Sequence, residues 1–261
     1  MDKYETKYPV VLVHGMVIKD FKRYRAFRKI RDNLTKNGVK VYVTNQDGLG
    51  RINTNAMQLK EEILEILKKE NVDKVNLIAH SKGGVDCRYM ISKLKMDNHI
   101  ASLTTLSTPH YGSKMSRNIL KMPKWFAKFV AVFINLTYKV FKDKQPDILG
   151  LAYDVTDENM KEFNKEVKNS TKVYYQSYSS NVENKRLFIM LLPHKFSTYS
   201  ENDDTDGIVS VESSKWGEYQ GDLGNFDHGE MVGVYGNKKT LKEVSDFYLH
   251  VVEQLKKKER N

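Results

Sequence analysis

The sequence predicts a single α/β domain built around a mostly parallel β-sheet. Through the first half of the chain, short β-branched runs alternate with longer stretches of helical periodicity. This alternation is typical of βαβ units, which place parallel strands in one sheet. The chain has 261 residues, of which 40% are hydrophobic and 29% are charged. These values suit one globular domain with a substantial core, so residues 1–261 are predicted to fold as one unit.

The predicted strands are short runs rich in β-branched and other apolar residues, and the predicted helices have apolar residues three or four positions apart. Asn37-Gly38 supplies the turn that closes the first helix. In chain order the elements are a strand at 10–13, a helix at 21–36, a strand at 39–43, a helix around 56–66, a strand at 75–79, a helix at about 83–94 and a strand at about 100–106.

The alternation breaks between residues 114 and 150. The stretch 125–141 is almost continuously apolar and aromatic, and only Lys128, Asn135 and Lys139 interrupt it. Its seventeen residues with two lysines are too few and too charged to predict a membrane-spanning helix. The segment at about 114–150 is therefore predicted to be a helical lid or cap insertion, with a permanently buried helix as the alternative.

The last third returns to strand-like runs near residues 172–179 and 186–192. A final helix follows, in which apolar residues recur on one face. We expect this helix to pack on the sheet through Leu241, Val244, Tyr248, Val251 and Leu255.

Composition narrows the class of protein. Lys and Arg outnumber Asp and Glu by 43 to 33, a net charge of +10 that favours anionic surfaces. The lysines are scattered along helices and no nucleic-acid-binding motif accompanies them, so no nucleic-acid partner is predicted. The single cysteine, Cys87, excludes an internal disulfide. Met1 to Tyr8 lacks the apolar core of a signal peptide. We expect a cytoplasmic protein, or a secreted one if a leader was removed. The sequence does not determine the oligomeric state, and a monomer is consistent with it.

The most informative segment is 76–84, Asn-Leu-Ile-Ala-His-Ser-Lys-Gly-Gly, where an apolar strand meets a small-x-Ser-x-Gly-Gly turn and a helix. A serine on such a turn has a strained backbone and an exposed hydroxyl, and its neighbours must be small. Ala79 takes the place of the usual first glycine. A helix-capping role for Ser81 is the alternative, but it leaves Gly83-Gly84 unexplained. Ser81 is therefore the candidate nucleophile.

Three segments together resemble the bacterial triacylglycerol lipase family of the α/β-hydrolase superfamily. They are His14-Gly15-Met16, the run from Ala79 to Gly84, and Leu-Ser-Thr-Pro-His-Tyr-Gly-Ser at 106–113. The resemblance implies an α/β-hydrolase fold and a serine ester hydrolase without an organic cofactor. It also implies an oxyanion hole formed by the backbone N–H groups of Met16 and Lys82. A simple tight turn is the alternative for His14-Gly15.

The base and acid are sought downstream, because α/β-hydrolases supply Ser, then Asp or Glu, then His in chain order. Of the seven histidines, His194 and His228 remain, and His228 is preferred because its loop resembles the histidine segment of the family. For the acid, Asp206 precedes a glycine and a predicted apolar strand, as in the family, and Asp204 is the reserve. Asp227, beside the proposed base, is interpreted as structural.

Relatives with a structural calcium carry a carboxylate two residues after the catalytic histidine, where Glu230 stands. Lys185-Arg186 occupies the region in which the other ligand is expected. No metal is therefore predicted, and Glu230 is at most a weak calcium candidate.

The apolar stretch indicates the substrate. Trp125, Phe126, Phe129 and Phe133 are expected to contact an acyl chain or a lipid interface as part of the lid. The predicted function is a lipase or esterase acting on acyl esters through an acyl-enzyme on Ser81. A phospholipase, thioesterase or acyltransferase with the same three residues is the alternative, and a noncatalytic lipid-binding or interaction module is the alternative from another class.

Overall fold

The computed structural model describes residues 3–16, 26–182 and 204–259. Within these ranges the strands form one six-stranded sheet in the order β2-β1-β3-β4-β5-β6, and every neighbouring pair is parallel. The predicted parallel sheet is confirmed. The strands are β1 (Val10–Val13), β2 (Val41–Val43), β3 (Val75–His80), β4 (Ile100–Leu106), β5 (Tyr174–Ser179) and β6 (Glu218–Asp222).

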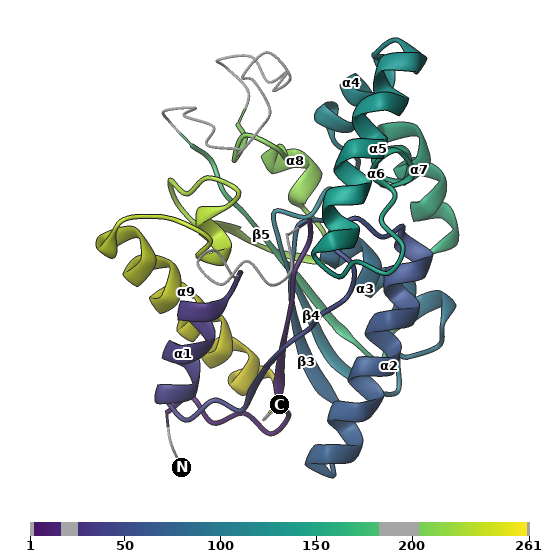
Figure 1. Cartoon of the computed structure of the whole chain (residues 1–261). Coiled ribbons are helices and arrows are strands. Elements are labelled where there is room, and N and C mark those ends of the chain that lie inside the picture. The colour runs from purple at the N-terminus through teal and green to yellow at the C-terminus, as the bar shows by residue number, and fades with distance from the viewer. Residues whose placement is uncertain (1–2, 17–25, 183–203, 260–261) are drawn as a thin grey trace.

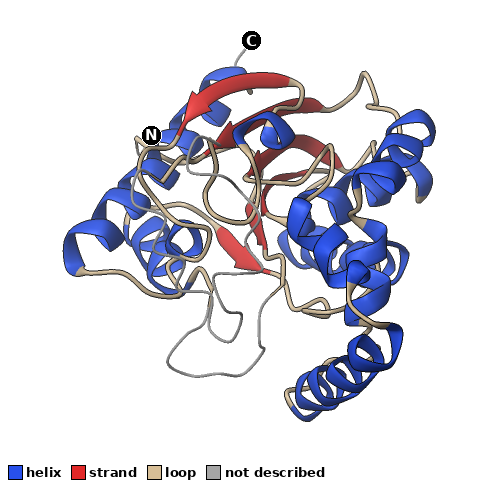
Figure 2. Ribbon diagram, turned by 90° about the horizontal axis from the view of Figure 1, so that it is seen from above, coloured by secondary structure: helices blue, strands red, loops and turns tan. Residues whose placement is uncertain are grey.

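Helices cover both faces of the sheet (Figures 1 and 2). On one face, α1 (Arg28–Lys36) and α9 (Lys238–Lys258) share an apolar cluster with the strands, as predicted for the C-terminal helix. On the other face, α2 (Ile52–Glu70) and α3 (Lys82–Lys93) form a second cluster. Burial on both faces explains why β1 reads as an unbroken apolar run and why β3 is mostly apolar rather than alternating.

The register brings the carboxyl ends of the central strands together. Ala79 of β3 pairs with Val13 of β1 on one side and with Thr105 of β4 on the other. Parallel sheets with helices on both faces bind their ligands at this edge. Ser81, one residue beyond β3, therefore lies where a site is expected.

A separate group of helices lies between β4 and β5 in the chain and sits beyond the carboxyl edge of the sheet, near α8 (Figure 1). It consists of α4 (Lys114–Lys121), α5 (Lys124–Val140), α6 (Ile148–Asp154) and α7 (Asp157–Glu166). Two short helices, α8 (Val211–Ser214) and η2 (Glu230–Val232), follow later in the chain.

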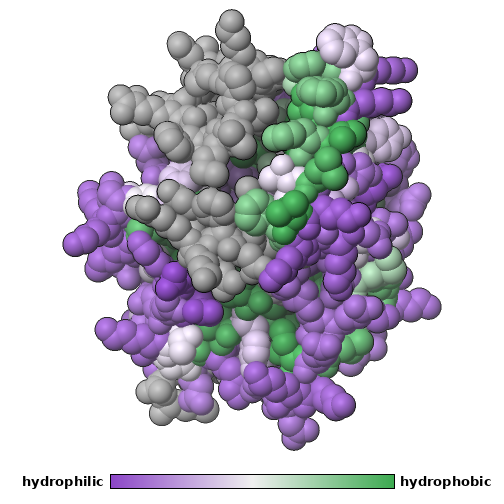
Figure 3. Space-filling view, viewed as in Figure 1, coloured by the Kyte–Doolittle hydropathy of each residue, from purple (hydrophilic) through white to green (hydrophobic). Residues whose placement is uncertain are grey.

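Most of the apolar surface of α5 faces outward, so the alternative of a permanently buried helix is wrong. Its buried residues are Ala127 and Ala131. Trp125, Phe129 and Phe133 are 74%, 72% and 72% exposed, and Figure 3 shows a hydrophobic band in this region. Among the described helices, none has the combination of length and hydrophobicity that crossing a bilayer requires.

Two sequence-based expectations differ from the structure or fall outside it. Ile208 and Val209 do not form a strand: they belong to a turn that is closed by an isolated bridge between Thr205 and Ser210. The helix expected at 21–36 is described only from Arg28 onward, and the expected strand at 186–192 lies outside the described residues.

Candidate active site

Ser81 occupies a sharp bend between β3 and α3. Its backbone has φ 56° and ψ −138°, a conformation that a residue with a side chain adopts only under strain. The two glycines allow the surrounding backbone to approach. A Cβ on Gly83 would lie 2.5 Å from the His14 carbonyl oxygen, and one on Gly84 would lie 2.3 Å from the hydroxyl of Thr108. This close packing accounts for the Gly-Gly pair that helix capping leaves unexplained.

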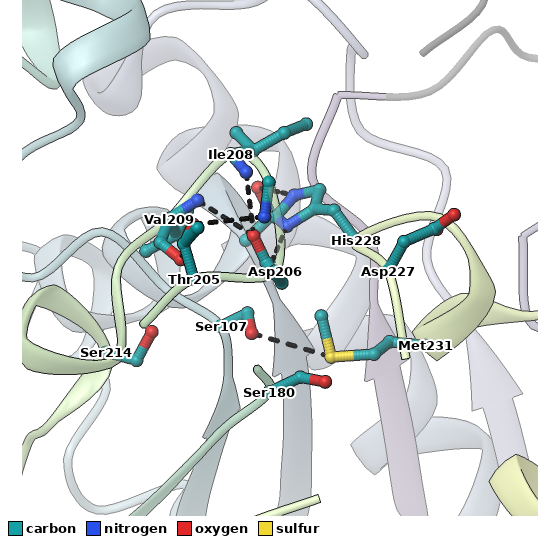
Figure 4. Close-up of polar contacts among 12 residues, drawn as sticks. Ser107, Ser180, Thr205, Asp206, Ile208, Val209, Ser214, Asp227, His228 and Met231 are labelled. Carbon is teal, nitrogen blue, oxygen red and sulfur yellow. Dashed lines mark hydrogen bonds and ion pairs between the residues drawn. The ribbon is translucent and has the colours of Figure 1, made fainter. Parts of the chain in front are cut away.

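The structure brings the three predicted site side chains together. His228 Nε2 lies 2.9 Å from Ser81 Oγ, and His228 Nδ1 lies 2.7 Å from Asp206 Oδ2. A carboxylate can only accept, so Nδ1 carries the proton and Nε2 is free to accept from the serine hydroxyl. Figure 4 shows the imidazole of His228 beside Asp206. This is the arrangement in which a serine hydroxyl can be deprotonated during attack.

Asp206 is fixed by its own loop. Its Oδ1 accepts hydrogen bonds from the backbone N–H groups of Ile208 at 2.9 Å and Val209 at 2.8 Å, as Figure 4 shows. The residue is 1% exposed. The two oxygens therefore have separate tasks: Oδ1 anchors the carboxylate, and Oδ2 receives the imidazole proton. The reserve candidate Asp204 is exposed and accepts from the side chain of Asn181 instead.

The end of β1 lies against this bend. A Cβ on Gly15 would be 2.7 Å from Ser81 Cβ and 3.2 Å from the backbone nitrogen of Lys82. Met16, the next residue, is half-buried, and Lys82 is the first residue of α3. Lys82 thus directly follows the serine, and Met16 follows Gly15, the residue whose backbone approaches Ser81.

Two contacts at the site were not anticipated from the sequence. The ring of buried His80 lies 4.4 Å from that of His228, centroid to centroid. Burial, followed by the nearby charge of His228, lowers the pKa of His80 well below its usual value. His80 thus stays neutral and packs against the candidate base.

The other contact comes from Thr108, whose hydroxyl donates to the carbonyl oxygen of Ser81 at 2.8 Å. Thr108 is fully buried. The segment 106–113 was recognised as a motif, but a sequence gives no indication that this hydroxyl would reach the residue 27 positions earlier. We interpret Thr108 as a positioning residue for the strained bend.

Hydrogen bonds to the carboxylates of Asp227 and Glu230 hold the loop around His228. Asp227 Oδ1 accepts from the backbone N–H groups of Gly229 and Glu230 at 2.9 Å each, and from the Tyr235 hydroxyl at 2.6 Å. Glu230 Oε2 accepts from the backbone N–H of Asp227 at 3.1 Å. These carboxylates are already engaged with donors, and the described part of the chain contains no cluster of three metal-binding side chains. Glu230, the weak calcium candidate, thus helps to hold this loop through its Oε2.

The predicted lid residues lie on α5. Trp125, Phe129 and Phe133 share an exposed stripe with Val132, Leu136 and Val140, and Phe126 at its edge is 40% exposed. Five exposed lysines flank this stripe: Lys121, Lys124, Lys128, Lys139 and Lys142. The structure thus gathers apolar side chains on α5 and basic side chains on this helix and just beyond its two ends.

Comparison with known proteins identifies relatives of this chain. Triacylglycerol lipase 2 of Saccharomyces cerevisiae is 38% identical over 210 residues, which are 78% of this chain and 60% of that protein. A triacylglycerol lipase of Pseudarthrobacter phenanthrenivorans is 36% identical over 141 residues, 50% of this chain and 44% of the relative. The chain therefore spans less than two thirds of the length of either relative. The predicted resemblance to triacylglycerol lipases is confirmed.

Solved structures agree on the fold. The lipase of Staphylococcus hyicus superposes with a TM-score of 0.72 at 18% sequence identity, covering 98% of each chain. At this identity the likeness concerns the fold alone, which is the predicted α/β-hydrolase fold. The sequence profile of the palmitoyl protein thioesterase family matches residues 9–226. Since this match includes all six described strands, the bend at Ser81 and the loop of Asp206, the chain belongs to the palmitoyl protein thioesterase family of α/β-hydrolases.

Proposed function

We propose that this protein is a serine hydrolase that cleaves acyl esters or thioesters of lipid-like substrates, with Ser81, His228 and Asp206 as its catalytic residues. The observation that carries the proposal is the hydrogen-bonded series from Ser81 Oγ through His228 to Asp206. Relatives named triacylglycerol lipase and the match to the palmitoyl protein thioesterase family support the same chemistry.

The proposed reaction has two stages. Ser81 Oγ attacks the acyl carbonyl carbon while its proton passes to His228 Nε2. The bond from that carbon to the leaving oxygen or sulfur then breaks, and His228 returns the proton to the leaving group. Water hydrolyses the resulting acyl-enzyme by the same route, which restores the serine. Asp206 keeps Nδ1 protonated and stabilises the imidazolium that forms in each stage.

The oxygen of the tetrahedral intermediate requires donors that are in place before charge develops. We assign this role to the backbone N–H groups of Lys82 and Met16. The close approach of Gly15 to both Ser81 and Lys82 supports this assignment. Removing one such donor from an enzyme of this kind costs about 10²- to 10³-fold in kcat.

We further propose that the helices around α5 cap the site and that α5 contacts lipid. Its stripe of exposed aromatic and aliphatic side chains supplies an apolar surface, and the flanking lysines suit anionic headgroups. An acyl chain delivered from such an interface would enter near the carboxyl edge of the sheet. Ester and thioester substrates place the same acyl group in the same position, so the leaving group must be established by assay.

A fluorophosphonate probe tests the proposal, because it forms a stable bond only with an activated serine. We expect labelling of the intact protein and none of Ser81→Ala. Ser107→Ala is the matched control, since Ser107 also follows a strand with positive φ, at 44°, but its hydroxyl donates to the sulfur of Met231. This variant should be labelled like the wild type. An unlabelled wild-type protein would favour a noncatalytic lipid-binding module instead.

Substrate class is then resolved by comparing p-nitrophenyl esters of increasing acyl length, emulsified triglyceride, phospholipid and palmitoyl-coenzyme A. A lipase is expected to cleave the long-chain esters and the triglyceride. Preferential cleavage of the thioester would assign the thioesterase alternative, and preferential release of fatty acid from phospholipid would assign a phospholipase.

A further inference from the structure

A buried ion pair lies directly behind the candidate nucleophile. Lys82 Nζ is 2.6 Å from Asp86 Oδ1, one turn further along α3, and the two side chains are 4% and 1% exposed. The pair is connected further. Asp86 Oδ2 accepts from Asn55 Nδ2 at 3.1 Å, and the same Nδ2 donates to the backbone carbonyl of Asp47 at 2.8 Å. These contacts link α3 through α2 to the loop between β2 and α2.

The far end of this series reaches the segment that follows α5. The Asp47 carboxylate accepts from the backbone N–H groups of Lys144 at 2.9 Å and Gln145 at 2.8 Å. The exchange is reciprocal, because the buried Asp143 carboxylate accepts from the backbone N–H groups of Gly48 at 3.0 Å and Leu49 at 2.9 Å. Two carboxylates thus clamp the loop at 47–49 to the segment at 143–145.

Stability alone does not account for the Lys82–Asp86 pair. Removing two charges from water costs several kcal/mol for each, and an apolar pair of similar volume is often as stable or more stable. Burial raises the pKa of Asp86, and the adjacent Lys82 opposes that rise. The position of the pair offers a better reason: Lys82 follows Ser81 and carries a backbone N–H that we assign to the oxyanion hole. A fixed Lys82 side chain fixes the first turn of α3.

We propose that Lys82 and Asp86, through Asn55 and Asp47, are positioning residues that hold the first turn of α3 in a fixed relation to the clamp behind α5. The inference rests on the proposed function, because it assigns this series the task of aligning the Lys82 N–H with the developing oxyanion. The same series of contacts connects the first turn of α3, which carries the Lys82 N–H, to the segment that follows α5. The helices around α5 lie beyond α2 and α3 in Figure 1.

The decisive variant is Lys82→Met/Asp86→Leu, which removes both charges together and keeps the backbone N–H of residue 82. The matched control is Lys242→Met/Asp246→Leu, because these residues form a pair of the same type and spacing on α9, with Nζ and Oδ2 2.6 Å apart, but exposed. We expect both variants to remain folded. With p-nitrophenyl butyrate, kcat of the buried-pair variant should fall about tenfold, since misplaced groups lose rate even when binding persists. Its KM should stay within about twofold, and the control should match the wild type.

A second measurement tests the connection itself. Asp47→Asn weakens the hydrogen bonds from the backbone N–H groups of Lys144 and Gln145. It should lower kcat by a smaller factor than Lys82→Met/Asp86→Leu does. Added to Lys82→Met/Asp86→Leu, it should cause little further loss, because residues acting through one series are not additive. If the double variant does not fold, Asn55→Ala breaks the same series one link away and is assayed in its place.

An unchanged kcat in the folded Lys82→Met/Asp86→Leu variant overturns the inference, as does full additivity with Asp47→Asn. These outcomes are distinct from failure of the proposed function. If the proposed function fails, the wild-type protein itself would neither hydrolyse the ester nor react with the fluorophosphonate.

Discussion

His228 Nε2 lies 2.9 Å from Ser81 Oγ although the two residues are 147 positions apart in the chain. The contact depends on two independently fixed loops. Ser81 is held at the bend between β3 and α3, and the backbone N–H of His228 donates to the carbonyl oxygen of Asp206 at 3.2 Å. The base and its orienting acid are therefore joined by backbone as well as by side chain, and they approach the serine as a unit.

The first prediction concerns the acid. Asp206→Asn should lower kcat by roughly 10³- to 10⁴-fold, because an amide in place of the carboxylate favours the wrong imidazole tautomer. Esterase kinetics measure the loss, and thermal unfolding shows whether the fold is kept. Asp204→Asn is the control, since Asp204 bonds to Asn181 rather than to His228. Equal losses in the two variants would contradict the assignment.

The second prediction concerns close packing at the bend. Gly83→Ala should destabilise the protein by about 1–3 kcal/mol through overpacking, because the added methyl would lie 2.5 Å from the His14 carbonyl oxygen. Gly221→Ala is the control: φ is +110° there, but nothing lies within 4 Å of the added Cβ. It brings backbone strain without a clash, so its stability cost comes from the backbone alone, and its kcat should be that of the wild type. Denaturant unfolding measures both costs, and an unchanged stability of Gly83→Ala would show that the backbone at His14 leaves room for a methyl group.

The third prediction concerns α5. In Phe129→Ser/Phe133→Ser, the ratio of the rate on emulsified triglyceride to the rate on a soluble short ester should fall at least about tenfold, because burial of each aromatic side chain at an interface contributes about 1.5–3 kcal/mol. Met57→Ser/Leu64→Ser on α2 is the control, since both residues are large, apolar and exposed. A ratio that falls equally in both variants would argue against a specific role for α5.

The fourth prediction follows from buried histidines. Burial, followed by the charge of Arg88, holds the pKa of His110 well below 6.5. Below pH 6.5 the unfolded chain therefore binds a proton that the folded state excludes, so the free energy of unfolding decreases as the pH falls. This contribution is fully present above pH 6.5, and its slope approaches about 1.4 kcal/mol per pH unit.

His110→Gln should make the free energy of unfolding less dependent on pH, because the variant takes up about one proton fewer on unfolding. Urea unfolding between pH 7 and pH 5 measures this difference. The buried His80 has a pKa lowered in the same direction, and Asp86, whose pKa burial raises, acts in the opposite direction. The wild type and the variant share the contributions of His80 and Asp86 to the pH dependence, so these contributions cancel in the comparison. Identical pH slopes would show that His110 does not stay neutral in the folded protein.

The sequence by itself determined the elements and the chemistry that are encoded locally. A continuous apolar strand, a bend of small residues and a following helix are features of neighbouring residues, so Ser81 and the parallel sheet were predictable. Order along the chain and resemblance then indicated His228 and Asp206. Ile208 and Val209 were mistaken for a strand, because two apolar residues after a glycine look alike in a strand and in a turn whose amides bind Asp206.

Only the tertiary structure decided the contacts between distant segments. Thr108 reaches the Ser81 carbonyl, His80 packs on His228, and Lys82 is connected through Asp86 to the clamp behind α5. The outward orientation of the aromatic residues on α5 was also undetermined, because an apolar helix has the same periodicity whether it packs inward or faces out. Such relations depend on register and on close approach of backbones, which no local pattern records.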